Sequence, residues 1–146
     1  MKTVFEKSTR DELVARISAL QEGHRPLWGK MTAAQMVRHC AQWDDMAMGR
    51  RKYRQSFIGK LFGKMALKDM MKDQPMRKNL PTVPSFKITE QPDLAEEKKK
   101  WILQLDDYAR FSNDNLIHPF FGKLSKEQTG VMVYKHADHH LRQFNV

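Results

Sequence analysis

The segment "SKEQTGVMVYKHADHHLRQF", residues 125–144, decides how the last part of this chain folds. Ser125 is followed three residues later by Gln128, which is the pattern of a capping box. In a capping box the two side chains bind N–H groups that the first turn of a helix leaves free. The sequence therefore predicts a helix over residues 126–144.

Three of the six histidines lie on this predicted helix. At about 100° per residue, His136 and His140 lie one turn apart on one face, and His139 is offset by about 60° from His136. Two imidazoles at this spacing can converge on one metal ion. This two-histidine pattern is short and also occurs by chance. A metal ion would in addition need ligands from another part of the chain. We expect His139 to be a residue of the rim.

A second amphipathic segment, "MTAAQMVRHCAQWDDMAMG" at residues 31–49, predicts a helix over about 32–48. Met36, His39 and Trp43 follow one another at steps of three and four, so they share a face that points inward. If this helix packs antiparallel to the last one, His39 lies opposite His136 and His140. Three neutral imidazoles with open positions suit Zn²⁺, Ni²⁺ or Fe²⁺. A core histidine with one hydrogen-bonded partner is the alternative for His39.

Two more amphipathic segments predict helices over about 9–22 and 92–114, with Ser8 or Thr9 capping the first. Residues 50–91 are basic and rich in proline; a helix is expected at 57–73, and an extended loop after it. No strand signal is visible, and residues 116–125 are expected to be a loop. The sequence predicts one all-α domain, residues 1–146: an antiparallel four-helix bundle with a basic, proline-rich insertion between its second and third helices.

The balance of charge allows a partner of another class. The chain carries 26 Lys and Arg against 17 Asp and Glu, a net charge of +9. The basic segment 50–78 could bind an anionic polymer such as nucleic acid, or a membrane surface. No RNA-recognition, zinc-finger or phosphate-loop motif accompanies the charge. Because Asp69 interrupts the apolar face of 57–73, we expect this helix rather to cap the bundle or to form a homodimer contact.

The apolar runs and the cysteine content of the chain bear on its cellular location and on disulfide bonds. No run approaches the roughly 18 apolar residues of a membrane span, and residues 1–14 have no apolar signal core. The single cysteine, Cys40, excludes an intramolecular disulfide and is expected to be a small buried residue. We expect a cytoplasmic protein.

Several polar residues are candidates for chemistry beside the histidines. His118, which precedes a proline, is either an acid or base at the mouth of the pocket or a turn residue. Arg142 either binds a substrate carboxylate or lies on the surface. Asp44 and Asp45 either orient an imidazole or serve as a base, or they are exposed carboxylates at a helix end. The last helix lacks the glutamate of the HExxH motif, so it carries no protease-type base.

The phrases "HRPLWGKMTAAQMVRHCAQW" (24–43) and "HPFFGKLSKEQTGVMVYKHADHHLRQF" (118–144) resemble the DinB/YfiT-like superfamily of metalloenzymes. More narrowly, they resemble a bacterial subfamily of unassigned function. The resemblance implies an antiparallel four-helix bundle with a metal bound by His39, His136 and His140, and Gln143 also matches the pattern. For some members it implies transferase or isomerase chemistry with a low-molecular-weight thiol such as glutathione, bacillithiol or mycothiol.

The expected function is therefore that of a metal-dependent enzyme, a small-thiol-dependent transferase or a hydrolase, acting on a small-molecule substrate. The alternative is a non-catalytic module that binds an anionic polymer or a membrane through residues 50–78.

Overall fold

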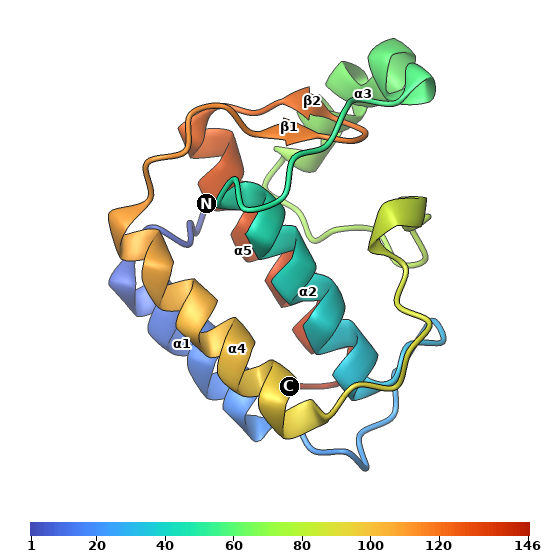
Figure 1. Cartoon of the computed structure of the whole chain (residues 1–146), viewed down its shortest axis with the longest axis vertical. Coiled ribbons are helices and arrows are strands. Elements are labelled where there is room, and N and C mark those ends of the chain that lie inside the picture. The colour runs from blue at the N-terminus through green and yellow to red at the C-terminus, as the bar shows by residue number, and fades with distance from the viewer.

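The computed structural model describes residues 1–146, which form a mostly helical fold (Figure 1). Its five α-helices are α1 (Lys7–Ala19), α2 (Ala33–Ala47), α3 (Phe57–Met70), α4 (Leu94–Asp107) and α5 (Lys126–Gln143). Two 3₁₀ turns lie at Pro84–Phe86 and Tyr108–Arg110, and a hairpin is formed by β1 (Ile117–His118) and β2 (Gly122–Lys123). None of these helices has the length and apolar character that crossing a membrane requires.

Four of the helices share one hydrophobic core. In Figure 1, α1 lies beside α4, and α2 lies over α5; α2 and α1 each also contact both α4 and α5. Each of these helices buries an apolar stripe, as amphipathic helices of a globular protein do. The fully buried side chains include Leu13, Met36, Trp101, Leu105 and Met132. The predicted mostly helical fold is confirmed at this level.

Both predicted capping boxes are present. Thr32 Oγ1 accepts from the backbone N–H of Gln35, and the Gln35 side chain accepts from the backbone N–H of Thr32. Ser125 and Gln128 make the same pair of bonds at the start of α5. These bonds satisfy N–H groups that a helix start leaves without intrahelical partners. They fix where α2 and α5 begin, and these two helices carry the three histidines that are candidate ligands.

The start of α1 differs from the prediction that Ser8 or Thr9 caps it. The helix begins at Lys7 after Glu6, which makes no side-chain cap, and it ends at Ala19. The buried guanidinium of Arg10 donates to the carbonyl groups of Val4 and Phe5. These bonds hold the preceding segment against the helix, so the helical turn forms before the predicted caps.

The chain between α4 and α5 also differs from the predictions. α4 ends at Asp107 instead of about 114, because Tyr108 turns inward and Phe111 packs against its ring at 5.8 Å. Residues 116–125 are not a plain loop, and the expected absence of strands was wrong, since β1 and β2 pair there. Two-residue strands are too short to show an alternating pattern. Gly122 allows the turn, with a φ of +81°.

Candidate metal centre

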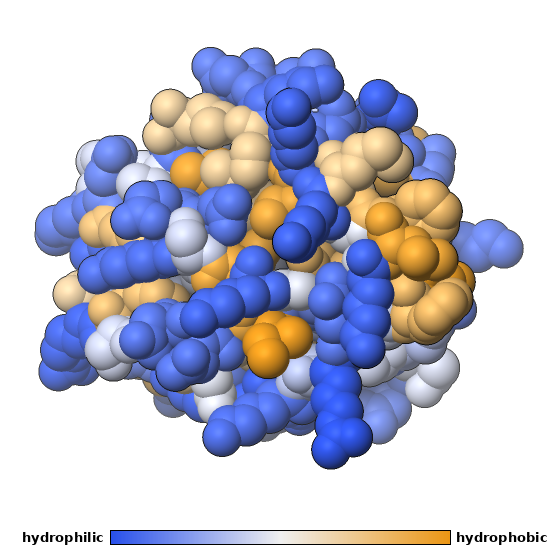
Figure 2. Space-filling view, turned by 90° about the horizontal axis from the view of Figure 1, so that it is seen from above, coloured by the Kyte–Doolittle hydropathy of each residue, from blue (hydrophilic) through white to orange (hydrophobic).

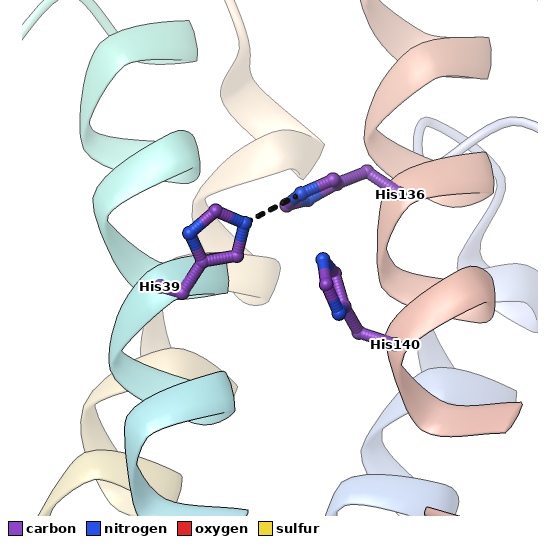
Figure 3. Close-up of side chains that lie close together, drawn as sticks. All are labelled: His39, His136 and His140. Atoms are coloured by element: carbon purple, nitrogen blue, oxygen red, sulfur yellow. Dashed lines mark hydrogen bonds between the residues drawn. The ribbon is translucent and has the colours of Figure 1, made fainter. Parts of the chain in front are cut away.

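His39 lies on the buried face of α2 and points toward α5 (Figure 3). Its Nδ1 lies 2.9 Å from the carbonyl oxygen of Phe86, in the 3₁₀ turn of the proline-rich segment. A ring nitrogen that faces a carbonyl oxygen must donate a proton, so Nδ1 carries the hydrogen and Nε2 keeps its lone pair. The backbone carbonyl of Phe86 therefore fixes the tautomer of His39.

His140 is held in the same way from the other side. Its Nδ1 lies 2.8 Å from the side-chain oxygen of Gln143, and the Gln143 amide donates to the carbonyl of Trp28 at 2.6 Å. Because the Gln143 amide gives its hydrogen to Trp28, its oxygen is the group that faces His140. His140 thus donates from Nδ1 and keeps the lone pair of Nε2. Gly29 makes room for this contact, since a Cβ at Gly29 would lie 2.8 Å from Nε2 of Gln143.

His136 completes the group. Its Nε2 lies 3.0 Å from Nε2 of His39, and its ring stacks on Trp43 with centroids 5.6 Å apart. His39 and His140 are buried, whereas His136 is only partly buried. His136 is therefore the most exposed of the three histidines.

The three histidines lie close enough to hold a metal ion, because one ring nitrogen from each lies within 4.8 Å of the others. Two imidazoles bound to one tetrahedral Zn²⁺ at 2.0–2.1 Å have nitrogens about 3.3 Å apart. The 3.0 Å separation of the His39 and His136 nitrogens is close to that value. Because Nδ1 of His39 carries its proton, Nε2–H of His136 donates to Nε2 of His39, and a metal ion bound by both nitrogens would take the place of that proton. The donor set fits a divalent transition metal, such as Zn²⁺, Ni²⁺ or Fe²⁺.

The electrostatic surroundings keep these imidazoles neutral. Burial, and after it the nearby His39, lowers the pKa of His140 to about 3. Burial also lowers the pKa of His39. The pKa of His136 is lowered well below its ordinary value, first by burial and then by His140 and His39. Neutral imidazole is the form that binds metals, so no proton needs to leave near pH 7.

His118 lies in the hairpin, outside the group of three. Its Nδ1 accepts from the backbone N–H groups of Phe120 and Phe121, each at 3.1 Å. Its buried ring stacks on Phe121 at 4.5 Å and lies 6.0 Å from that of Trp43, and burial lowers its pKa to about 4. Of the two predicted roles, these bonds correspond to the turn residue.

Arg142 and His139 flank the group on α5. Arg142 Nε donates to Asp138 one turn away at 2.9 Å, which corresponds to the surface alternative. His139 is more buried than a rim residue, with only 6% of its surface exposed. Its ring packs against Trp28 with centroids 5.4 Å apart. Neither residue belongs to the three-histidine group.

Asp44 and Asp45 correct another prediction, that of exposed carboxylates at a helix end, since both are buried. Asp44 accepts from Trp101 Nε1 and from the Tyr108 hydroxyl, each at 2.8 Å. Asp45 accepts from Gln104 at 2.6 Å. These bonds join α2 to α4 and leave neither carboxylate among the histidines. Burial raises the pKa of Asp44 to about 7.

The hydrogen-bonded partners of the histidines were harder to predict than the histidines. Phe86 and Trp28 act through backbone carbonyls, which any residue type has, so no sequence pattern indicates them. The positive φ of Gly29, +77°, has a local signal, because glycine is the residue that adopts this conformation without strain.

Comparison with curated proteins and with solved structures gave no significant match. The family described as "Protein of unknown function (DUF1569)" matches residues 4–146, which is nearly the whole chain. The chain therefore belongs to the DUF1569 family.

Proposed function

We propose that this protein is a metal-dependent enzyme that acts on a small molecule through His39, His136 and His140. With it we propose the finer fold, an antiparallel four-helix bundle of the DinB type formed by α1, α2, α4 and α5. The packing of these helices around one core supports the fold. The sequence resemblance supports both the fold and the chemistry.

One observation carries the proposal, namely that the histidine rings are oriented from behind. His39 and His140 each donate from Nδ1, to Phe86 and Gln143, while Nε2 faces the centre of the group. Outer partners of this kind fix the tautomer and the orientation of metal-binding histidines. A core histidine needs one partner, but it does not need two more imidazoles turned toward the same point. The arrangement thus favours metal binding over simple packing.

The neighbouring groups limit the chemistry. A divalent metal in such a site polarises an electrophile, or lowers the pKa of a bound water or thiol. Asp44 and Asp45 are bonded to α4, so neither is placed as a general base. This favours a nucleophile that ionises without a protein base. A low-molecular-weight thiol in a transferase and water in a hydrolase both meet that condition.

The protein's own groups then shape the site. Partly exposed His136 marks the side from which a substrate enters, and the ring of Trp43 stacks against it. Phe86 covers His39 from the proline-rich segment, with ring centroids 6.2 Å apart. These apolar walls exclude water from the inner side of the group. They favour a small substrate with an apolar part.

The test is metal content, measured by elemental mass spectrometry on protein purified without a polyhistidine tag. About one equivalent of a transition metal is expected in the parent protein and in the control His24→Ala, because His24 lies in a loop outside the group. His39→Ala and His136→Ala are expected to contain much less. An empty parent that also refuses added Zn²⁺, Ni²⁺ and Fe²⁺ would refute the proposal.

A loaded protein is then assayed with small electrophiles and esters, with and without thiols. Turnover that requires a thiol identifies a transferase, and turnover with water alone identifies a hydrolase. In either case His136→Ala is expected to abolish turnover. Full metal occupancy without turnover in a broad screen would count against the enzymatic part of the proposal.

A further inference from the structure

Helix α3 exposes a cluster of apolar side chains on one face, interrupted by Asp69. Five large apolar side chains are each at least half exposed: Phe57 (76%), Ile58 (62%), Leu61 (62%), Phe62 (50%) and Met65 (70%). At about 100° per residue they cover an arc of roughly 140°. Single exposed apolar residues are ordinary, but a contiguous group of them marks an interaction surface.

The packing of α3 keeps this face turned outward. The opposite face carries Gly59 and Gly63, which lie on the backbone of the hairpin. A Cβ at Gly59 would lie 2.5 Å from the carbonyl oxygen of Phe120, and one at Gly63 would lie 2.1 Å from it. Only glycine allows so close an approach. The helix therefore cannot turn a phenylalanine or leucine toward the hairpin without losing contact.

The two ends of α3 are held as well. At the start, the backbone N–H of Ser56 donates to the carbonyl of Pro119 at 2.8 Å. At the end, Lys135 Nζ donates to the carbonyls of Met70 and Lys72 at 2.6 and 2.7 Å. Lys135 precedes the ligand candidate His136 on α5. The exposed face is thus anchored rigidly to the part of the molecule that holds the histidines.

The positive charge of the protein is concentrated around this face. Residues 50–78 contain ten Lys and Arg and two Asp, which gives +8 of the chain's net +9. Lys60 and Lys64 are exposed along one flank of the apolar arc, and Lys68 is exposed just inside that edge. Figure 2 looks onto this end of the molecule and shows hydrophobic surface next to long hydrophilic side chains. Asp69, which interrupts the pattern, pairs with Lys72 at 2.7 Å and with Arg77 at 3.6 Å.

We propose that the α3 face, defined by Phe57, Ile58, Leu61, Phe62 and Met65 with Lys60, Lys64 and Lys68, docks the protein onto an anionic lipid bilayer. The helix would lie in the plane of the interface, with apolar side chains among the acyl chains and lysines at the headgroups. Apolar burial and attraction to anionic lipids together drive this mode of binding. It does not depend on the histidines.

Two other partners for the α3 face, a second copy of the protein and nucleic acid, fit its charge and its apolar side chains less well. A second copy would bring two segments of about +8 together, and like charges across an interface disfavour association. Nucleic acid would neutralise the lysines, but its phosphate contacts would leave the phenylalanines in water. An acidic bilayer offers partners to both kinds of side chain. This is the complementarity on which the proposal rests.

The test is co-sedimentation of the full-length protein with vesicles. Vesicles of phosphatidylcholine with phosphatidylglycerol are compared with vesicles of phosphatidylcholine alone, at low and high salt. We expect binding to the anionic vesicles, weakened by salt. Lys60→Gln/Lys64→Gln should lower the partition coefficient about fivefold per lysine, because each contributes about 1 kcal/mol near an anionic surface.

Loss of apolar side chains should act independently. Leu61→Gln/Phe62→Gln is expected to lower the partition coefficient about tenfold or more, since it removes two buried anchors. Leu103→Gln and Lys99→Gln are matched controls, because both residues are exposed on α4, away from α3. Neither control should change binding. Circular dichroism and urea unfolding verify that all variants fold alike.

Several results would overturn the proposal. One is no binding to anionic vesicles at low salt, or equal binding to both kinds of vesicle. Another is binding that the lysine variant weakens and the apolar variant does not, which would mean a general polyanion contact. A third is a protein that does not bind vesicles but is a dimer in light scattering, and that becomes a monomer in the variant Leu61→Gln/Phe62→Gln.

Discussion

The side-chain oxygen of Gln143 lies 2.8 Å from Nδ1 of His140. Gln143→Ala should therefore lower Zn²⁺ affinity about 10- to 100-fold, the usual cost of losing a partner that orients a metal-binding histidine. Gln143→Glu should restore only part of the affinity, because it keeps an oxygen acceptor for Nδ1–H but places its second oxygen against the carbonyl of Trp28. Competition with a chromogenic chelator measures both. Equal loss in both variants, or no loss in either, would contradict the positioning role.

Gly29 permits that contact, and its replacement should disturb two properties together. Its φ is +77°, and an added Cβ would meet Gln143 at 2.8 Å. Gly29→Ala should lower the free energy of unfolding by roughly 1–2 kcal/mol from backbone strain alone, and should weaken Zn²⁺ binding. Gly23→Ala is the control, because nothing lies within 4 Å of its added Cβ. Urea unfolding and zinc titration test this, and a Gly29→Ala variant as stable as Gly23→Ala would refute it.

Asp44 should make the stability of the protein depend on pH. Its folded pKa, about 7, is raised above the ordinary 3.8, mainly by burial. The folded state therefore holds this proton more tightly than the unfolded state, and the stabilisation, present below about pH 4, is lost as pH rises through about 7. Over this window the loss is on the order of 4 kcal/mol.

The test of this linkage compares metal-free parent protein with Asp44→Asn, by urea unfolding at several pH values. The asparagine can still bond to Trp101 and Tyr108, but it does not titrate. Relative to Asp44→Asn, the parent should lose stability as pH rises from 4 to 8; histidine titration is common to both and cancels. The exposed carboxylate of Asp106 provides a control, Asp106→Asn. A constant difference between parent and Asp44→Asn would show that Asp44 does not titrate there.

Metal removal should destabilise the folded state. A ligand present at about 100 times its Kd adds about 2.7 kcal/mol, which raises the Tm of a chain of this size by roughly 5–10 °C. Chelation should therefore lower the Tm of the loaded parent by that amount. His136→Ala should show almost no change on chelation, and His24→Ala should respond like the parent. A shift that persists in His136→Ala would place the metal elsewhere.

Features that depend on residues within one or two helical turns could be predicted from the sequence. The Thr32–Gln35 and Ser125–Gln128 capping boxes each lie within one helical turn, and both formed as predicted. The i, i+4 spacing of His136 and His140 follows from helix geometry in the same way. Helix α3 was also indicated by its sequence, within a few residues of its observed bounds. The β1–β2 hairpin was missed because its strands are shorter than any period.

Burial was harder to predict than helicity. For Asp44 the sequence left open a role beside an imidazole, as its orienting partner or as a base, or an exposed carboxylate at a helix end, and the structure shows it buried against α4. Its hydrogen-bond donors, Trp101 and Tyr108, lie 57 and 64 positions later in the chain, and only the packing of α4 on α2 brings them together. The same holds for His139, whose burial depends on Trp28. A residue's own sequence neighbourhood does not contain these partners.

By itself the sequence determined that these segments are helical and on which helix faces His39, His136 and His140 lie, because both depend on spacings within a few turns. Only the tertiary structure decided that His39 and His136, 97 positions apart, bring their Nε2 atoms to 3.0 Å. It also decided that the carbonyl of Phe86 holds the ring of His39, that the carbonyl of Trp28 orients Gln143, and that the apolar side of α3 faces outward. The physical reason is that these relationships depend on backbone carbonyls and on close packing between distant segments, which no local pattern encodes.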